Sequence, residues 1–197
     1  MKHLVIYAHP NPKSFSQAIQ ETIVEELRAN HNDVNTRDLY QMGFNPILAS
    51  SDFEQLHAGQ VPSDIKAEQD LVKWADILTF IYPIWWGGMP AILKGYIDRV
   101  FAYNFAYKYE NGVPLGLLND KKVMVFNPTG SSDELYEQIG MHEAIEKTSD
   151  LGIFKFCNME VLEHKFFGGV PSVDQTVRER YLKETKAIIS KYTNVGV

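Results

Sequence analysis

Residues suited to binding a phosphorylated ligand lie in a short loop at 9–16, HPNPKSFS. Ser14 and Ser16 bring two hydroxyls to the start of a predicted helix, where unpaired backbone N–H groups and the helix dipole attract an anion. This pattern is typical of a phosphate site, and His9 could donate a further hydrogen bond to the phosphate. A helix that is only capped by a serine, beside a structural histidine, has the same pattern, so both interpretations stay open.

A second loop, PIWWGG at 83–88, places Trp85 and Trp86 beside a Gly-Gly turn. Large aromatic side chains at a strand end favour a planar ligand that covers them. The glycines would let backbone N–H groups approach the polar edge of a flavin ring, and a tryptophan would pack against that ring. A core or dimer contact is the alternative. The third loop, NPTGSS at 127–132, offers a hydroxyl and backbone donors to the same ring, although many turns share such a sequence.

These loops connect short apolar strands with amphipathic helices. We predict strands at 3–8, 34–39, 76–82, 122–126 and 156–162, and helices at 16–27, 65–75, 91–100 and 177–189. Capping-box patterns mark helix starts at Ser14, Ser131 and Ser172, and a weaker helical stretch leads to Thr148. In the long segment before the second helix, two prolines and a glycine argue against regular structure.

Strands that alternate with helices, without repeats or linkers, predict one three-layer α/β domain over 1–197. In an open parallel sheet a ligand binds at the carboxyl ends of the strands, where the strand order reverses. The three loops follow the first, third and fourth predicted strands, so we expect them to meet at that edge. The first strand is not followed by G-x-G-x-x-G, and the sequence has no G-x-x-x-x-G-K-[ST]. We therefore expect nucleotide chemistry of another kind.

The composition excludes several classes of protein. The chain has 197 residues, of which 45% are hydrophobic, enough for a sizeable core, and its formal charge of −6 disfavours a nucleic-acid binder. The single cysteine, Cys157, falls in a predicted strand as a small hydrophobe, and it indicates a reducing compartment. No apolar run approaches the roughly 18 residues of a membrane span, and the N-terminal stretch is too short for a secretory signal. We expect a cytoplasmic protein that is not integral to a membrane.

Several other catalytic patterns do not occur in the sequence. There is no G-x-S-x-G of a hydrolase and no H-E-x-x-H of a metalloprotease. The six histidines show no metal-ligand spacing, so we expect no metal site.

Several segments resemble the flavodoxin-like NAD(P)H:quinone oxidoreductases, the DT-diaphorase family. The longest is PIWWGGMPAILKGYIDRVF at 83–101. Further matches, in the family's order and spacing, are 105–109, the turn at Thr129 and Gly130, Tyr136 with His142, and 156–157 with 161–163.

The resemblance implies a flavodoxin-like three-layer sandwich with a five-stranded parallel sheet and a flavin cofactor. The residues that the resemblance places around the phosphate and ribityl side of the flavin are His9, Ser14, Phe15, Ser16 and Ala18. Those that it places along the isoalloxazine ring are Pro83, Ile84, Trp85, Trp86 and Gly87, and those at the pyrimidine edge of the ring are Thr129, Gly130 and Ser131. FAD is favoured over FMN, because Phe15 and the segment 45–62 resemble the FAD-binding branch of the family.

The resemblance also implies the two-electron reduction of quinones, azo compounds or nitroaromatic compounds, with hydride supplied by NAD(P)H. Tyr136 and His142 match the pair that stabilises the reduced flavin in the family. Tyr107, Tyr109 and Phe156 would reach across a homodimer interface into the partner's substrate pocket.

Two positions depart from the family pattern and leave the shape of the acceptor pocket open. Ser131 replaces the second glycine of the pyrimidine-edge turn, and Gly87 stands where an aromatic residue often follows the tryptophan. Two other functions also remain open: a flavin-binding regulatory or ancillary subunit of a membrane ion transporter, and a one-electron flavodoxin carrier. The presence of these four residues favours an enzyme over both of these functions: Tyr107, Tyr109, Tyr136 and His142.

Overall fold

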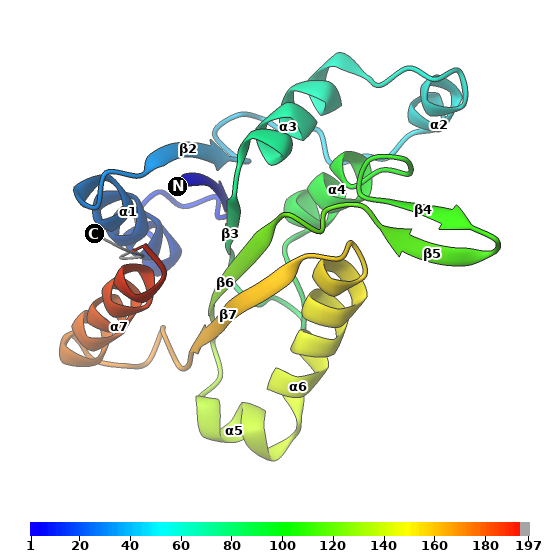
Figure 1. The fold of residues 1–197 in the computed structure, drawn as a ribbon. Helices are drawn as coiled ribbons and strands as arrows, with labels where there is room; N and C mark the ends of the chain where they lie inside the picture. The colour runs from blue at the N-terminus through cyan, green and yellow to red at the C-terminus, as the bar shows by residue number, and fades with distance from the viewer. Residues whose placement is uncertain (194–197) are drawn as a thin grey trace.

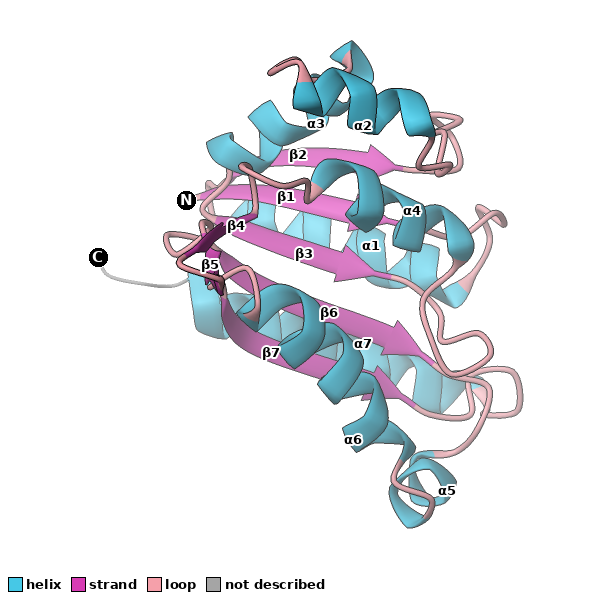
Figure 2. Ribbon diagram, turned by 90° about the vertical axis from the view of Figure 1, so that its right-hand side faces the viewer, coloured by secondary structure: helices cyan, strands magenta, loops and turns pink. Residues whose placement is uncertain are grey.

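The computed structural model describes residues 1–193 and is built on a central five-stranded sheet (Figure 1). Its strands, in spatial order, are β2 (Asp33–Asp38), β1 (Lys2–Tyr7), β3 (Ile77–Ile81), β6 (Lys122–Pro128) and β7 (Glu160–Phe167). Every neighbouring pair is parallel. The carboxyl ends of all five strands therefore lie along one edge, as Figure 2 shows. The predicted five-stranded parallel sheet is confirmed.

Helices cover both faces of this sheet. One face is covered by α1 (Phe15–Ala29) and α7 (Gln175–Thr193). The other is covered by α3 (Ser63–Trp74), α4 (Ala91–Val100), α6 (Met141–Glu146) and the π-helix η1 (Lys147–Lys155). Two short helices, α2 (Ser50–His57) and α5 (Asp133–Gln138), lie at the periphery (Figure 1). Within residues 1–193, no helix combines the length and apolar character needed to cross a membrane.

The strands are apolar on both sides because both of their faces are covered. In β1, Leu4 and Ile6 enter the core beneath α3 and α4, while Val5 and Tyr7 enter the core beneath α1 and α7. The continuous apolar run that indicated a buried strand is thus the natural pattern of a central parallel strand.

Helix α2 lies in a segment for which we predicted no regular structure. It is held by a distant residue, because Arg99 of α4 donates from Nε to Asp52 Oδ2 at 3.0 Å. The chain before α2 also packs tightly on α4: a Cβ added to Gly95 would lie 2.1 Å from the carbonyl oxygen of Pro46. Only glycine fits at this contact. The local sequence pattern did not predict α2, because contacts with residues distant in the sequence stabilise this helix.

A second difference concerns the chain before β7. The strand predicted at 156–162 is wrong in its first part, because the chain stays helical to Lys155 and turns before β7 begins at Glu160. Short apolar runs such as GIFKFC do not distinguish a buried helix from a strand. Cys157 is nevertheless buried as a small hydrophobe, and burial raises the pKa of its thiol to about 12.

The structure also adds an antiparallel hairpin, β4 (Tyr107–Glu110) and β5 (Val113–Gly116), outside the main sheet. The hairpin packs on the turn that follows η1, where the Leu118 N–H donates to the carbonyl oxygen of Cys157 at 2.9 Å. This turn leads into the start of β7. The hairpin therefore lies at the amino end of the sheet, opposite the three loops (Figure 2).

Of the predicted helix caps, the one at Ser14 is confirmed: its Oγ accepts a hydrogen bond from the Gln17 N–H at 3.1 Å. The other two predicted caps are wrong. Ser132, not Ser131, caps α5, and before α7 it is Asp174 Oδ1 that accepts from the Val177 N–H. The hydroxyl of Ser172 instead donates to the carbonyl oxygen of Gly169.

Candidate functional site

The three loops leave neighbouring strands at the same level of the sheet. Tyr7, Ile81 and Phe126 are register partners at the ends of β1, β3 and β6. Beyond them the second and third loops stay joined, since the Ile84 N–H donates to the carbonyl oxygen of Pro128 at 3.0 Å. The ring centroids of His9 and Trp85 lie 5.5 Å apart, so the first and second loops also meet. The predicted convergence at the carboxyl edge is observed.

The first loop ends at the N-terminus of α1. The side chain of Ser14 caps the helix and lies 3.2 Å from the Tyr7 hydroxyl. The backbone N–H groups of Phe15 and Ser16, in the first turn, have no intrahelical partner. His9 accepts from the Asn11 N–H at Nδ1, and burial lowers the pKa of His9, so the neutral ring carries its proton on Nε2. This loop can therefore offer an anion several N–H donors.

The second loop is a tight two-residue turn. Trp85 and Gly88 exchange two backbone hydrogen bonds, at 2.9 and 3.1 Å, and Trp86 and Gly87 between them have φ of 52° and 74°. A bulky residue rarely adopts a positive φ, so the turn holds Trp86 in a strained conformation. Its side chain is fully exposed and that of Trp85 partly so, whereas Pro83 and Ile84 are buried beneath them. Two indole rings are thus uncovered at the edge of the sheet.

The third loop presents backbone rather than side-chain donors. Thr129 is buried, and its hydroxyl donates to the carbonyl oxygen of Ser131 at 2.8 Å. The hydroxyl that the sequence suggested for a ligand is therefore already engaged. A Cβ added to Gly130 would meet nothing within 4 Å, so this turn borders open space. The N–H groups of Gly130 and Ser131 remain as the donors of this loop.

Tyr136 of α5 and His142 of α6 are brought together beside this third loop. Their ring centroids lie 5.5 Å apart, edge to face, and the imidazole also stacks on Phe166, with ring centroids 4.2 Å apart. The Nε2 atom of His142 lies 3.5 Å from Asp133 Oδ1. Both of these atoms are buried and lack a closer partner within residues 1–193. Asp133 was missed in the sequence because no motif marks it.

The expected substrate residues lie away from the loops. Tyr107 of β4 contacts Tyr109 and Phe156, with ring centroids 6.1 and 5.3 Å apart. This aromatic cluster sits with the hairpin at the amino end of the sheet. Since α4 has ten residues, it separates the cluster from the second loop by about 15 Å along its axis. Within one protomer, therefore, the structure does not bring these three residues to the loops.

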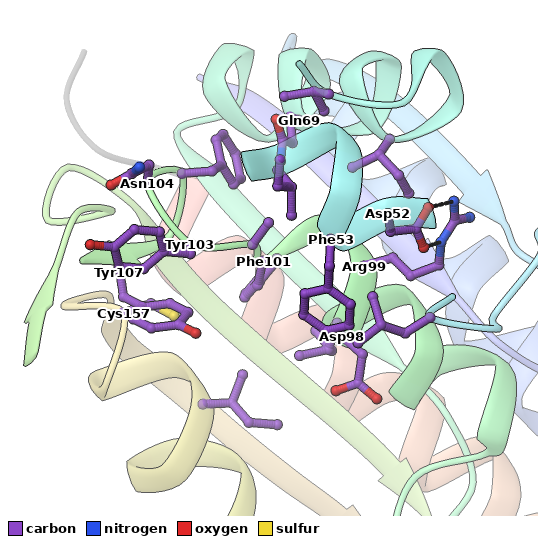
Figure 3. A pocket seen from close by; sticks show the side chains of 18 of the residues that line it. Asp52, Phe53, Gln69, Asp98, Arg99, Phe101, Tyr103, Asn104, Tyr107 and Cys157 are labelled. Atoms are coloured by element: carbon purple, nitrogen blue, oxygen red, sulfur yellow. Dashed lines mark hydrogen bonds and ion pairs between the residues drawn. The ribbon is translucent and has the colours of Figure 1, made fainter. Parts of the chain in front are cut away.

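A groove of about 1450 Å³ runs over α4 from Gly87 and Gly88 to the aromatic cluster. In Figure 3, Tyr103, Tyr107 and Cys157 lie at one end of the view and the paired Asp52 and Arg99 at the other. Most of the lining is apolar or aromatic, which suits a flat organic molecule or a partner surface.

A smaller hollow, of about 370 Å³, lies beside the N-terminus of α1. Phe15 and Ala18 contribute apolar surface to it, and Lys13 and Arg178 contribute positive charge. The Nε atom of Arg178 is buried without a hydrogen-bond partner within residues 1–193. Arg178 was missed in the sequence because nothing in its helical context distinguishes it.

These features fit a flavin. Uncovered indole rings, an open glycine turn and an N-capped helix end meet at one edge, and an orphaned guanidinium nitrogen lies nearby. A planar ring with a phosphorylated side chain requires such a combination of aromatic surface, backbone donors and an anion site. In the described part of the chain, no group of three or more His, Cys, Asp or Glu residues is arranged to hold a metal ion.

Known proteins resemble this chain over nearly its whole length. An "Uncharacterized NAD(P)H oxidoreductase" of Haemophilus influenzae is 40% identical over 184 residues, which cover 93% of this chain and 91% of the relative. "NAD(P)H dehydrogenase [quinone] 1" of Rattus norvegicus is 31% identical, over 93% of this chain and 74% of the relative. The solved structure of an NAD(P)H:quinone oxidoreductase from Methanothermobacter marburgensis superposes with a TM-score of 0.87 at 30% identity, covering 100% of this chain and 99% of that one.

The family model described as "Flavodoxin-like fold" matches residues 1–190. This match spans the five parallel strands, the three loops at their carboxyl ends and most of α7. The chain therefore belongs to the flavodoxin-like family.

Proposed function

We propose that this protein is a flavin-dependent NAD(P)H:quinone oxidoreductase. The observation that carries the proposal is the meeting of three strand-end loops around uncovered Trp85 and Trp86, in a chain that is similar to named quinone oxidoreductases. Quinones, azo compounds and nitroaromatic compounds are the flat acceptors that an aromatic site would take. The named relatives are oxidoreductases, and none of them supports the alternative of a transporter subunit.

The proposed cofactor would be held by all three loops. The N–H groups at the start of α1, with Ser14 and His9, bind its phosphate. The second loop, 83–88, orients the ring through its backbone and its tryptophans, and the N–H groups of Gly130 and Ser131 hold the pyrimidine edge. When bound, the flavin would supply the chemistry of hydride transfer between NAD(P)H and the acceptor.

Tyr136 and His142 are proposed to stabilise the negative charge that collects at the pyrimidine edge. The Tyr136 hydroxyl is the donor, and His142 supports it from the side. The stack on Phe166 fixes the plane of the imidazole, and Asp133 faces its Nε2. Fixed donors in a site that partly excludes water stabilise such charge better than mobile water does.

We propose FAD rather than FMN, on the strength of the hollow beside α1. FMN would end at the N-terminus of α1 and leave this hollow empty. The adenosine of FAD would extend into it, with Phe15 as an apolar contact and Lys13 and Arg178 beside the second phosphate. The orphaned Nε of Arg178 supports an anionic partner at this place.

We also propose a homodimer whose active sites combine residues of both protomers. The aromatic cluster of Tyr107, Tyr109 and Phe156 lies at the end of the protomer opposite the loops, so it can serve a flavin only if that flavin belongs to a partner. Tyr109 and Phe156 are exposed in the protomer, as a contact surface requires.

The first test is the absorbance spectrum of the purified protein, followed by mass analysis of the flavin that heat releases. We expect bound FAD and rapid NAD(P)H oxidation with menadione. Released FMN would refute only the proposal that the hollow beside α1 holds the adenosine of FAD, and the proposed function would stand. A protein that binds neither flavin at micromolar concentration would refute the proposed function, and a flavin-loaded protein without turnover would favour a regulatory subunit.

The shared site is tested by mixing two inactive variants. One is Tyr107→Ala with Tyr109→Ala, and the other is Gly130→Trp, which fills the open turn without a clash at Cβ. Random exchange of subunits should restore about a quarter of the wild-type sites, because half of the dimers are mixed and each has one intact site. A mixture that stays inactive despite exchange, or a monomer in light scattering, contradicts the dimer proposal.

A further inference from the structure

A buried histidine behind the third loop is the centre of a polar network that the proposed function does not use. His164 of β7 has a side chain that is only 4% exposed. Its Nδ1 lies 2.9 Å from Asp150 Oδ1 of η1, and its Nε2 lies 2.7 Å from Asn127 Oδ1 of β6. In the sequence, His164 had no motif and no metal-ligand spacing.

The partners of His164 determine which of its ring nitrogens donates. The Asn127 amide is oriented by its Nδ2, which donates to the carbonyl oxygen of Tyr82 at 2.8 Å. That carbonyl can only accept, so Asn127 must present Oδ1, an acceptor, to His164. The Nε2 atom of His164 therefore carries a proton and donates to Asn127, while Nδ1 faces the carboxyl group of Asp150.

The network joins the chain segments from which two of the loops begin. Asn127 lies near the end of β6, two residues before Thr129, and Tyr82 directly follows β3, immediately before the second loop at 83–88. Their hydrogen bond ties these two strand ends together. Because Asn127 is completely buried, its amide is held by these protein partners, the Tyr82 carbonyl and His164, rather than by water.

The same histidine also contacts the Tyr136–His142 pair through one aromatic ring. The His164 ring stacks on Phe166 with centroids 4.4 Å apart, and Phe166 stacks on His142 at 4.2 Å. Both pairs of planes are inclined by 22°. A displacement of His164 would therefore change the support of His142 as well as the orientation of Asn127.

We propose that His164 is a positioning residue of the flavin site: through Asn127 it holds the two ring-binding loops in register, and through Phe166 it fixes the plane of His142. This inference rests on the proposed function. The opposing view is that His164 and Asp150 form a buried hydrogen-bonded pair that stabilises the fold and has no effect on the site.

The hydrogen-bond assignment is tested on flavin-free protein by NMR with ¹⁵N-labelled histidine. We expect an Nε2–H signal for His164, assigned by its loss in His164→Leu. In Asp150→Asn the amide can donate to Nδ1 while Nε2–H still donates to Asn127, so the Nε2–H signal should remain and the geometry should persist. A wild-type protein in which Nε2 of His164 carries no proton overturns the assignment.

The positioning role is tested by flavin affinity and by the ring-proton shifts of His142 in the same proteins. His164→Leu should bind flavin about tenfold more weakly or worse and should shift the His142 signals, because it removes the buried hydrogen bond to Asn127 and the ring that stacks on Phe166. Asp150→Asn should stay within about twofold of the wild type, since both hydrogen bonds are retained. Thr185→Val is the control, because it removes a buried hydrogen bond on α7, away from the loops.

Wild-type flavin affinity and unshifted His142 signals in folded His164→Leu overturn the proposal. An equal loss of affinity in Thr185→Val also overturns it, because general destabilisation would then explain both variants. Failure of the proposed function would look different: the wild type would bind no flavin while the Nε2–H signal of its His164 remained.

Discussion

Replacing Tyr136 or His142 tests whether this pair stabilises charge on the cofactor. Tyr136→Phe removes the hydroxyl and keeps the ring that meets His142 edge to face. His142→Gln removes the ring that stacks on Phe166 and faces Asp133. Neither change touches the phosphate end of the site, so flavin binding should remain nearly unchanged.

The size of the effect follows from what remains in the site. Removing one donor from a well-organised oxyanion site costs ~2–4 kcal/mol of transition-state stabilisation. Here the N–H groups of Gly130 and Ser131 remain, and Tyr136 is only partly buried, so the lower part of this range applies. Because these donors remain, the loss should fall at the lower end of this range or below it, at about 1.4–2.7 kcal/mol, which is a ten- to hundredfold slower reduction of the flavin.

Stopped-flow absorbance of the flavin under excess NAD(P)H measures this step directly. Because the two rings are in contact and act on the same charge, the double variant should be little slower than the slower single variant. Tyr192→Phe is a matched control, since its hydroxyl donates to the carbonyl oxygen of Leu162, away from the loops. If both single variants reduce flavin at the wild-type rate, the pair is a surface feature and the backbone donors alone stabilise the charge.

Three further predictions concern stability. Ser14→Ala removes the cap of α1 and should lower the free energy of unfolding by about 1 kcal/mol in urea titration, with weaker flavin binding. Gly95→Ala places a Cβ against Pro46 and should cost about 3 kcal/mol, whereas Gly88→Ala, where a Cβ meets nothing, should leave stability nearly unchanged. Burial lowers the pKa of His3 to about 4, so below its unfolded value of 6.5 only the unfolded chain gains this proton. Stability should therefore fall by about 3 kcal/mol between pH 6.5 and 4, and His3→Leu should abolish this part of the fall.

Local pattern was sufficient for the sheet and for the position of the site. Strands covered on both faces are apolar throughout, so β1, β3 and β6 were evident as short apolar runs. Ser14 marked the start of α1 because capping depends on residues close in sequence. Once the strands were parallel, the loops after them had to meet at one edge.

Tertiary contacts decided the features that have no local signal. Helix α2 depends on Asp52 and its distant partner Arg99, and the hairpin β4–β5 depends on the turn after η1. The aromatic residues of this hairpin could be recognised in the sequence, but their place at the far end of the protomer could not.

The hydrogen bonds of His164 illustrate the same division between local pattern and tertiary contact. Residue types and spacing determined which groups could bind a flavin, because capping, turn formation and strand burial act over a few neighbouring residues. Which ring nitrogen of a histidine donates depends on the groups that face its two nitrogens. For His164 these come from β6 and η1, 37 and 14 residues away in the chain, and only folding brings them together.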